Sequence, residues 1–288
     1  MIPFQEKSPE ITGQLIKYPD FKSEYIQARN VDVWLPDNYD PNSEDGYSVL
    51  YMHDGQNLFD PAPSNIGEEW GVDETMSRLM DEGRIQDCIV VGIWCTEDRM
   101  EEYTPNKPYQ RMLENKKSMD KEYIPPEGTP GGDSYLIFIV KELKPFIDDN
   151  YNTIPDREHT FIAGSSMGGL ISLYALVEYP EVFSGAACLS THWPLDIQEI
   201  TPDFVNAYAG YLDKNLYPEN RQKVYFDYGT ETLDQYYEPL QMVIDSLMQA
   251  KGFDESSWKT LKFEGAVHNE VSWRERFDIP VLFLLGQK

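Results

Sequence analysis

The sequence predicts an α/β protein built as a three-layer αβα sandwich, with a mostly parallel central sheet between two layers of helices. Short apolar runs typical of buried strands alternate with helical segments throughout the second half of the chain, and this alternation indicates βαβ units. The chain has 288 residues, enough for one large α/β domain. It contains no internal repeat, low-complexity tract or linker, so we expect a single domain over residues 1–288.

The net charge limits the possible partners. Asp and Glu total 50 against 24 Lys and Arg, which gives −26 at neutral pH. A surface with this much negative charge repels phosphate backbones and anionic lipids. We therefore expect no nucleic-acid partner and no membrane partner. No window approaches the roughly 18 consecutive apolar residues of a membrane span. Neutral or weakly charged small molecules fit this charge better than strongly anionic substrates.

The cysteines and the N-terminal residues give information about the cellular compartment of the protein. Cys88, Cys95 and Cys188 all lie in apolar runs, and an odd count without metal-ligand spacing argues against a disulfide framework or a zinc site. The first residues have neither a basic region nor an apolar core, so they do not form a signal peptide. A chain that starts after a cleaved signal would look the same, and we favour a secreted or periplasmic location over a cytoplasmic one.

The first third of the chain is expected to open the sheet. Residues 10–18 and 25–35 are rich in Ile, Val, Tyr and Trp, and they read as antiparallel strands that precede a parallel sheet. The elements expected next are a strand over 48–52, a helix over 70–80 and a strand over 88–94.

A long polar stretch, 96–132, shows no pattern of a packed element. Loops of this length in a compact domain are usually functional or disordered. We therefore expect an insertion that covers the active site, where side chains stack on a sugar or an aromatic acyl group. The alternative is a solvated charged loop. The side chains in question are Tyr103, Tyr109, Met112 and Tyr123.

The second half supplies the βαβ units. A helical pattern over 133–150 precedes a strand that starts at Thr160, and a helix from Leu170 to Glu178 follows it. Strands are then expected over 184–189, 223–228 and 258–263, with helices over 204–212, 237–251 and 271–285.

A five-residue motif, Gly164-Ser165-Ser166-Met167-Gly168, joins the Thr160 strand to its helix. G-x-S-x-G between a strand and a helix is typical of a nucleophile elbow, with Ser166 as the nucleophile. We expect a β-carbon at Gly164 or Gly168 to clash, and the serine to adopt a strained backbone conformation. The alternative is an ordinary Gly/Ser loop.

A serine hydroxyl needs a base, and the base needs a third group to orient it. Binding sites in parallel sheets form beyond the carboxyl ends of the strands. His268 follows the last strand, in the chain order serine, acid, histidine, and is the candidate base. The loop after the preceding strand offers Asp234 and Glu231. We favour Asp234 because a short acid on a tight loop orients an imidazole well, and Glu231 remains the alternative.

The oxyanion that forms during attack on an ester needs two backbone donors. The amide of Met167, at the start of a helix, is one candidate. The amide of Gln56, in the Asp54-Gly55-Gln56 turn, is the other, with a plain turn as the alternative. His192 and Trp193 follow a sheet strand and are candidates for an acyl-pocket wall, although a tryptophan there is more often simply packed.

Four segments carry a resemblance to the esterase branch of the α/β-hydrolases. That branch includes feruloyl and acetylxylan esterases (carbohydrate esterase family one), siderophore esterases, S-formylglutathione hydrolase and mycolyltransferases. The resemblance implies the α/β-hydrolase fold, Ser166 as nucleophile, His268 as base, and no metal or organic cofactor. It leaves Asp234 and Glu231 open. The segments are Tyr51 to Phe59, Gly164 to Gly169, Asp227 to Thr230 and Gly265 to His268, and the segment from Arg99 to Pro105 also resembles these esterases.

The predicted function is that of a serine carboxylesterase that removes feruloyl or acetyl groups from plant polysaccharide such as xylan, through an acyl-enzyme intermediate. Tyr103, His192 and Trp193 are its expected substrate-binding residues. A siderophore or thiol-ester hydrolase on the same residues is the alternative. A non-catalytic carbohydrate-binding relative would be expected to lack the nucleophile, the base or an elbow glycine, and the sequence contains all three.

Overall fold

A computed structural model of the chain describes residues 3–6, 11–119, 130–196 and 200–287. These residues form one sheet of nine strands in the order β1-β2-β3-β5-β4-β6-β7-β8-β9. The strands are β1 Phe4–Glu6, β2 Gln14–Phe21, β3 Arg29–Leu35, β4 Ser48–His53, β5 Cys88–Ile93, β6 Thr160–Ser165, β7 Gly185–Leu189, β8 Lys223–Tyr228 and β9 Trp258–Lys262.

The sheet changes direction at β5. From β1 to β5 the neighbouring strands pair antiparallel, and from β5 through β4 to β9 they all pair parallel. The predicted antiparallel start of the chain is therefore confirmed. Strand β1 was not predicted, because three residues are too few to show a period. The parallel pairing brings the carboxyl ends of β4 and β6 to β9 to one edge of the sheet.

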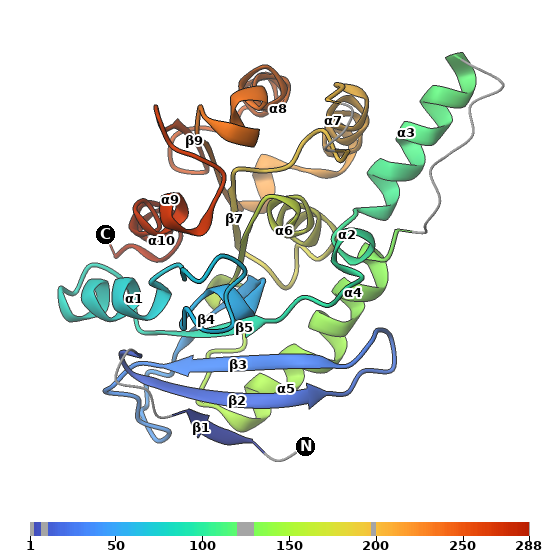
Figure 1. Ribbon diagram of the computed structural model, residues 1–288. Helices are drawn as coiled ribbons and strands as arrows, with labels where there is room; N and C mark the ends of the chain where they lie inside the picture. The colour runs from blue at the N-terminus through green and yellow to red at the C-terminus, as the bar shows by residue number, and fades with distance from the viewer. Residues whose placement is uncertain (1–2, 7–10, 120–129, 197–199, 288) are drawn as a thin grey trace.

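Helices cover both faces of the sheet (Figure 1). One apolar core lies under α1, α9 and α10, and the other lies under α3 to α8. The predicted three-layer α/β fold is confirmed. The helices are α1 Val72–Asp81, α2 Arg99–Glu102, α3 Asn106–Met119, α4 Gly132–Phe138, α5 Lys144–Asn150, α6 Met167–Glu178, α7 Asp203–Asn215, α8 Glu238–Ala250, α9 Glu270–Arg274 and α10 Asp278–Leu285. None of the helices described is long and apolar enough to cross a membrane.

The expectation of an unpacked loop over 96–132 is wrong for its described part. It forms α2 and α3, and α3 extends to the upper right of Figure 1. Helix α3 buries a stripe of four residues and packs against α7. Tyr109 and Met112 belong to this stripe, so they fill the core instead of stacking on a substrate. Tyr123 lies outside the described residues.

The helices predicted over 133–150 and 271–285 are each interrupted. A π-helical turn, Ile139–Leu143, joins α4 to α5. The C-terminal segment divides into α9 and α10 around Arg276 and Phe277, because Pro280 has no N–H to donate to the carbonyl of Arg276. Pro280 instead falls in the first turn of α10, where a missing N–H costs little.

Candidate active site

The elbow has the backbone predicted for it. Ser166 adopts φ 57° and ψ −120° between β6 and α6, and its amide donates to the carbonyl of Leu189 at 2.9 Å. A β-carbon at Gly164 would lie 2.9 Å from Cδ2 of His53 and 3.0 Å from the backbone of Gly168. A β-carbon at Gly168 itself would lie no closer than 3.4 Å to its neighbours. The prediction of a clash is therefore confirmed at Gly164 and wrong at Gly168.

His268 meets Asp234 beyond the ends of β8 and β9. The imidazole Nδ1 lies 2.5 Å from Oδ1 of Asp234, a carboxylate that is 1% exposed. Oδ2 accepts hydrogen bonds from the amide of Gly229 and the hydroxyl of Ser190, each at 2.6 Å. Burial works to raise the pKa of Asp234, but the bond to His268 and these two donors outweigh it and hold that pKa below its ordinary value.

Glu231 occupies a different position. It is exposed, and its carbonyl accepts from the amide of Asp234 at 3.2 Å. Glu231 thus precedes the 3₁₀ turn η5, Thr232–Tyr236, whereas Asp234 lies inside it and points at the imidazole. Of the two candidate acids, Asp234 is the one that contacts His268.

A second carboxylate lies behind Asp234. Asp227, fully buried, accepts from Nη2 of Arg276 at 2.8 Å, and that guanidinium nitrogen also donates to Oγ of Ser190 at 2.9 Å. The indole of Trp273 donates to the same oxygen at 3.0 Å. The Ser190 hydroxyl therefore accepts from two groups, and its own proton goes to Asp234. The Trp273 ring also packs edge-on against His268, at 5.1 Å between centroids.

The loop after β4, which carries the predicted oxyanion donor Gln56, is held close to β5. A β-carbon at Gly55 would lie 2.5 Å from the carbonyl carbon of Gly92, so only glycine allows this approach. The side chain of Gln56 bonds to Cys95 through both of its ends, at 2.9 and 3.2 Å. No acceptor among the described residues meets the backbone amides of Gln56 and Met167. Both predicted oxyanion donors are therefore unoccupied by protein groups.

Arg99, on α2, fixes the same loop from outside. Its Nε and Nη2 form a bidentate pair with the carboxylate of Asp54, both contacts at 2.7 Å. Burial works to raise the pKa of Asp54, and the charge of Arg99 more than offsets it, so that pKa lies below its ordinary value. The sequence reasoning assigned no role to this pair, although Arg99 opens one of the segments that carry the resemblance.

Two of the three predicted substrate-binding residues belong to the interior. Trp193 is fully buried, and its indole donates to Oε1 of Gln241 at 2.8 Å. Tyr103 is also fully buried, and its ring packs against those of His53 and Tyr135. Neither side chain exposes surface that a substrate can touch, which corrects the expectations that Trp193 walls an acyl pocket and that Tyr103 stacks on the substrate.

His192 is also enclosed, but it lies next to Ser166, the predicted nucleophile. Its amide donates to the carbonyl of Ser166 at 3.1 Å, and its Nδ1 lies 2.7 Å from the hydroxyl of Tyr237. The Tyr237 ring packs edge-on against His268, at 5.8 Å between centroids. Sequence reasoning missed Tyr237, because it read this residue as the start of an amphipathic helix.

The match to a family model decides the class of the chain. The model described as "Putative esterase" matches residues 23–283. The chain belongs to this esterase family. It is a carboxylic ester hydrolase with the fold of the α/β-hydrolases.

Three similar proteins illustrate the range of the family. The uncharacterized protein YbbA of Bacillus subtilis is 24% identical over 266 residues, which cover 90% of this chain and 93% of YbbA. The ferri-bacillibactin esterase BesA of Bacillus subtilis is 24% identical over 175 residues, 58% of this chain and 56% of BesA. The structure of a ferulic acid esterase aligns with a TM-score of 0.67 at 19% identity, covering 95% of this chain and 98% of that one.

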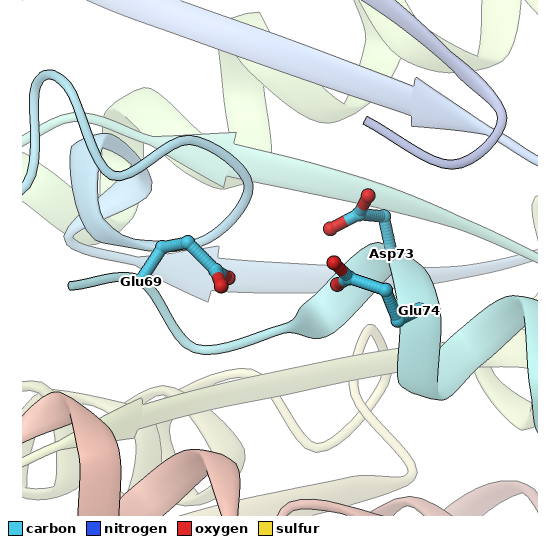
Figure 2. A group of neighbouring side chains, drawn as sticks. All are labelled: Glu69, Asp73 and Glu74. Atoms are coloured by element: carbon cyan, nitrogen blue, oxygen red, sulfur yellow. The ribbon is translucent and has the colours of Figure 1, made fainter. Parts of the chain in front are cut away.

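One group of carboxylates in the described part of this esterase has the spacing of a metal site. Glu69 precedes α1, and Asp73 and Glu74 lie in its first turn (Figure 2); their oxygens lie within 4.8 Å of one another. Burial and the neighbouring Glu74 raise the pKa of Asp73 to about 8. Protonation of Asp73 relieves the repulsion between the two acids. The three carboxylates lie outside the contacts of Ser166, His268 and Asp234 described above.

Proposed function

We propose that Ser166, His268 and Asp234 are the catalytic triad of this esterase. The observation that carries the proposal is the 2.5 Å contact between His268 and a buried Asp234, at the same edge of the parallel sheet as a serine with the backbone of an elbow. An acid in this position fixes the imidazole tautomer with a proton on Nδ1 and leaves Nε2 free to accept the serine proton.

The reaction then proceeds in two halves. Ser166 Oγ attacks the ester carbonyl carbon while His268 Nε2 takes its proton, and the oxyanion is held by the amides of Gln56 and Met167. The tetrahedral intermediate collapses, the C–O bond to the alcohol breaks, and His268 returns the proton to the leaving oxygen. Water attacks the acyl-enzyme by the same route and releases the carboxylic acid and free Ser166.

For the substrate, we propose feruloyl or acetyl esters on plant polysaccharide. The net charge of −26 disfavours strongly anionic esters. Arg99, the cation that borders the oxyanion loop, is already paired with Asp54. The ferulic acid esterase aligns over nearly the whole of both chains, which agrees with a substrate of that class.

Replacement of Ser166 by alanine tests the triad. We expect S166A to lose hydrolysis of p-nitrophenyl acetate and labelling by a fluorophosphonate probe, with an unchanged circular dichroism spectrum. Full activity in S166A would refute the mechanism. If the wild-type protein itself neither labelled nor hydrolysed any ester, the non-catalytic, carbohydrate-binding interpretation would replace it.

A siderophore ester is the second candidate, because BesA is named for that activity. A panel of methyl ferulate, acetylated xylan, ferric enterobactin and S-formylglutathione separates the classes by kcat/KM. We expect the first two to be preferred. A preference for ferric enterobactin or S-formylglutathione would overturn the polysaccharide proposal and leave the triad intact.

A further inference from the structure

Trp273 lies on the short helix α9, which begins directly after His268. The side chain of Asn269 caps this helix by accepting from the amide of Ser272 at 3.0 Å. The amide of Trp273 donates to the carbonyl of Asn269 at 3.1 Å, which closes the first turn. The cap and the turn therefore fix where the Trp273 ring lies, which is edge-on against the imidazole of His268.

The indole of Trp273 is held by three neighbours. Its Nε1 donates to Oγ of Ser190 at 3.0 Å, and its ring meets that of His268 with the centroids 5.1 Å apart. The buried ring of Trp70 packs against it at 5.2 Å between centroids. Trp273 itself is only 5% exposed. An indole that is enclosed in this way, with its one polar atom bonded, has little freedom to move.

The hydroxyl of Ser190 links the indole to the carboxylate of Asp234. Oγ of Ser190 meets Nε1 of Trp273 at 3.0 Å and Nη2 of Arg276 at 2.9 Å. An indole N–H and a guanidinium N–H can only donate, so the Ser190 oxygen accepts from both. Its own proton then goes to Oδ2 of Asp234, at 2.6 Å. The position of the indole is thereby coupled to the position of the carboxylate.

These contacts form a closed circuit of four side chains. His268 bonds to Asp234, Asp234 to Ser190, Ser190 to Trp273, and the Trp273 ring packs back against His268. The bond at Nδ1 alone would fix one atom of the imidazole and let the ring turn about that bond. The edge-on contact with Trp273 restricts this rotation, so the direction in which Nε2 points is set as well.

We infer that Trp273, anchored through its N–H to Ser190, is a positioning residue that holds the imidazole of His268 in the orientation needed for proton transfer. The inference rests on the proposed triad, in which His268 is the base. A misplacement of about 1 Å at a reacting group can cost about 10²-fold in rate, so a rigid base contributes to kcat. KM should not depend on Trp273, because this buried side chain offers almost no surface to a substrate.

The first test compares Trp273→Phe with Trp34→Phe. Trp34, on β3, is fully buried and donates from Nε1 to the carbonyl of Thr12, so each substitution removes one buried indole hydrogen bond. We expect W273F to lower kcat for p-nitrophenyl acetate and the rate constant of fluorophosphonate inactivation by about tenfold, the worth of one ordinary hydrogen bond, with KM unchanged. W34F should lower the melting temperature and keep kcat per competent site within about twofold of wild type. Labelling carried to completion counts the competent sites, so a misfolded fraction is separated from slow chemistry.

A double-mutant cycle tests whether Trp273 acts through Ser190. Ser190→Ala removes the oxygen that the indole N–H and Asp234 share. We expect S190A to be slowed about tenfold, and the double variant W273F/S190A to inactivate within about threefold of S190A.

Two results would overturn the inference. One is a wild-type inactivation rate in W273F, and the other is a loss in the double variant equal to the product of the two single losses. Loss of labelling in S166A would still support the nucleophile in either case. Wild-type labelling of S166A would instead refute the proposed triad, and this inference with it.

Discussion

Asp234→Asn is the sharpest test of how the site works. Oδ2 of Asp234 accepts from the amide of Gly229, a backbone donor that cannot reverse its role, at 2.6 Å. The oxygen of an asparagine must therefore stay on that side, and its NH₂ must face Nδ1 of His268. Nδ1 can then only accept, which moves the ring proton to Nε2. A protonated Nε2 cannot take the proton of Ser166.

The expected loss of kcat is large because an imidazole that carries its proton on Nε2 cannot act as the general base. Asparagine at the corresponding acid of serine proteases lowers kcat by about 10⁴-fold, and we expect a loss of about 10³- to 10⁴-fold here. That range corresponds to about 4 to 5.5 kcal/mol of transition-state stabilisation. The assay is kcat on p-nitrophenyl acetate, with S166A as the background and the melting temperature as a check on the fold.

Glu231→Gln is the matched control, since it removes a carboxylate from the same loop. Its side chain is exposed, so we expect kcat within about twofold of wild type, as for most surface substitutions. The tautomer reasoning is refuted if D234N retains more than a tenth of wild-type kcat. It is also refuted if E231Q loses as much as D234N.

Three further predictions concern stability, each read from thermal unfolding. Gly164→Ala should lower the free energy of unfolding by about 1–3 kcal/mol through overpacking. Gly168→Ala is the control and should lower it by less, because the nearest atom to the new β-carbon lies at 3.4 Å. Equal losses of stability in the two variants would contradict this geometry. Arg276→Met leaves the buried carboxylate of Asp227 without its cation and should cost about 3–5 kcal/mol; an unchanged melting temperature would show that the pair contributes nothing. Because the pKa of Asp73 is raised to about 8, its contribution to stability is full below an unfolded pKa of about 3.9 and is lost as pH rises toward 8. Asp73→Asn should therefore raise the melting temperature at pH 8 by several degrees and leave it unchanged at pH 4, and the same gain at both values would contradict the assigned pKa.

The fold was predictable where the hydrophobic pattern was long and continuous. The buried strands β4 to β8 read as unbroken apolar runs, and this is the pattern of a parallel sheet covered on both faces. Helix α3 was not predicted because its buried stripe has only four residues among charged neighbours, and because Pro108 lies inside its first turn. A proline in the first turn costs a helix little, so its presence was a weak reason to predict a loop.

The candidate site was predictable in part, because strand ends meet at one edge of a parallel sheet. That rule placed Ser166, His268 and Asp234 near one another without any knowledge of the distances. It could not decide whether an aromatic residue at the same edge lines a pocket or fills the core. Trp193 fills the core, where Gln241 accepts from its indole N–H across 48 positions of sequence. No local pattern reports such a partner.

The charges behind the imidazole explain why two buried aspartates coexist at this edge. Asp227 and Asp234 both bond to Ser190, one through its amide and the other through its hydroxyl. Arg276 pairs directly with Asp227, so its positive charge balances that carboxylate. Only the charge of Asp234 is then left without a full cation, and it faces Nδ1 of His268. In the proposed mechanism, a cation on Asp234 would oppose the imidazolium that forms during attack, whereas the Ser190 hydroxyl fixes the carboxylate and leaves its charge available to stabilise that imidazolium.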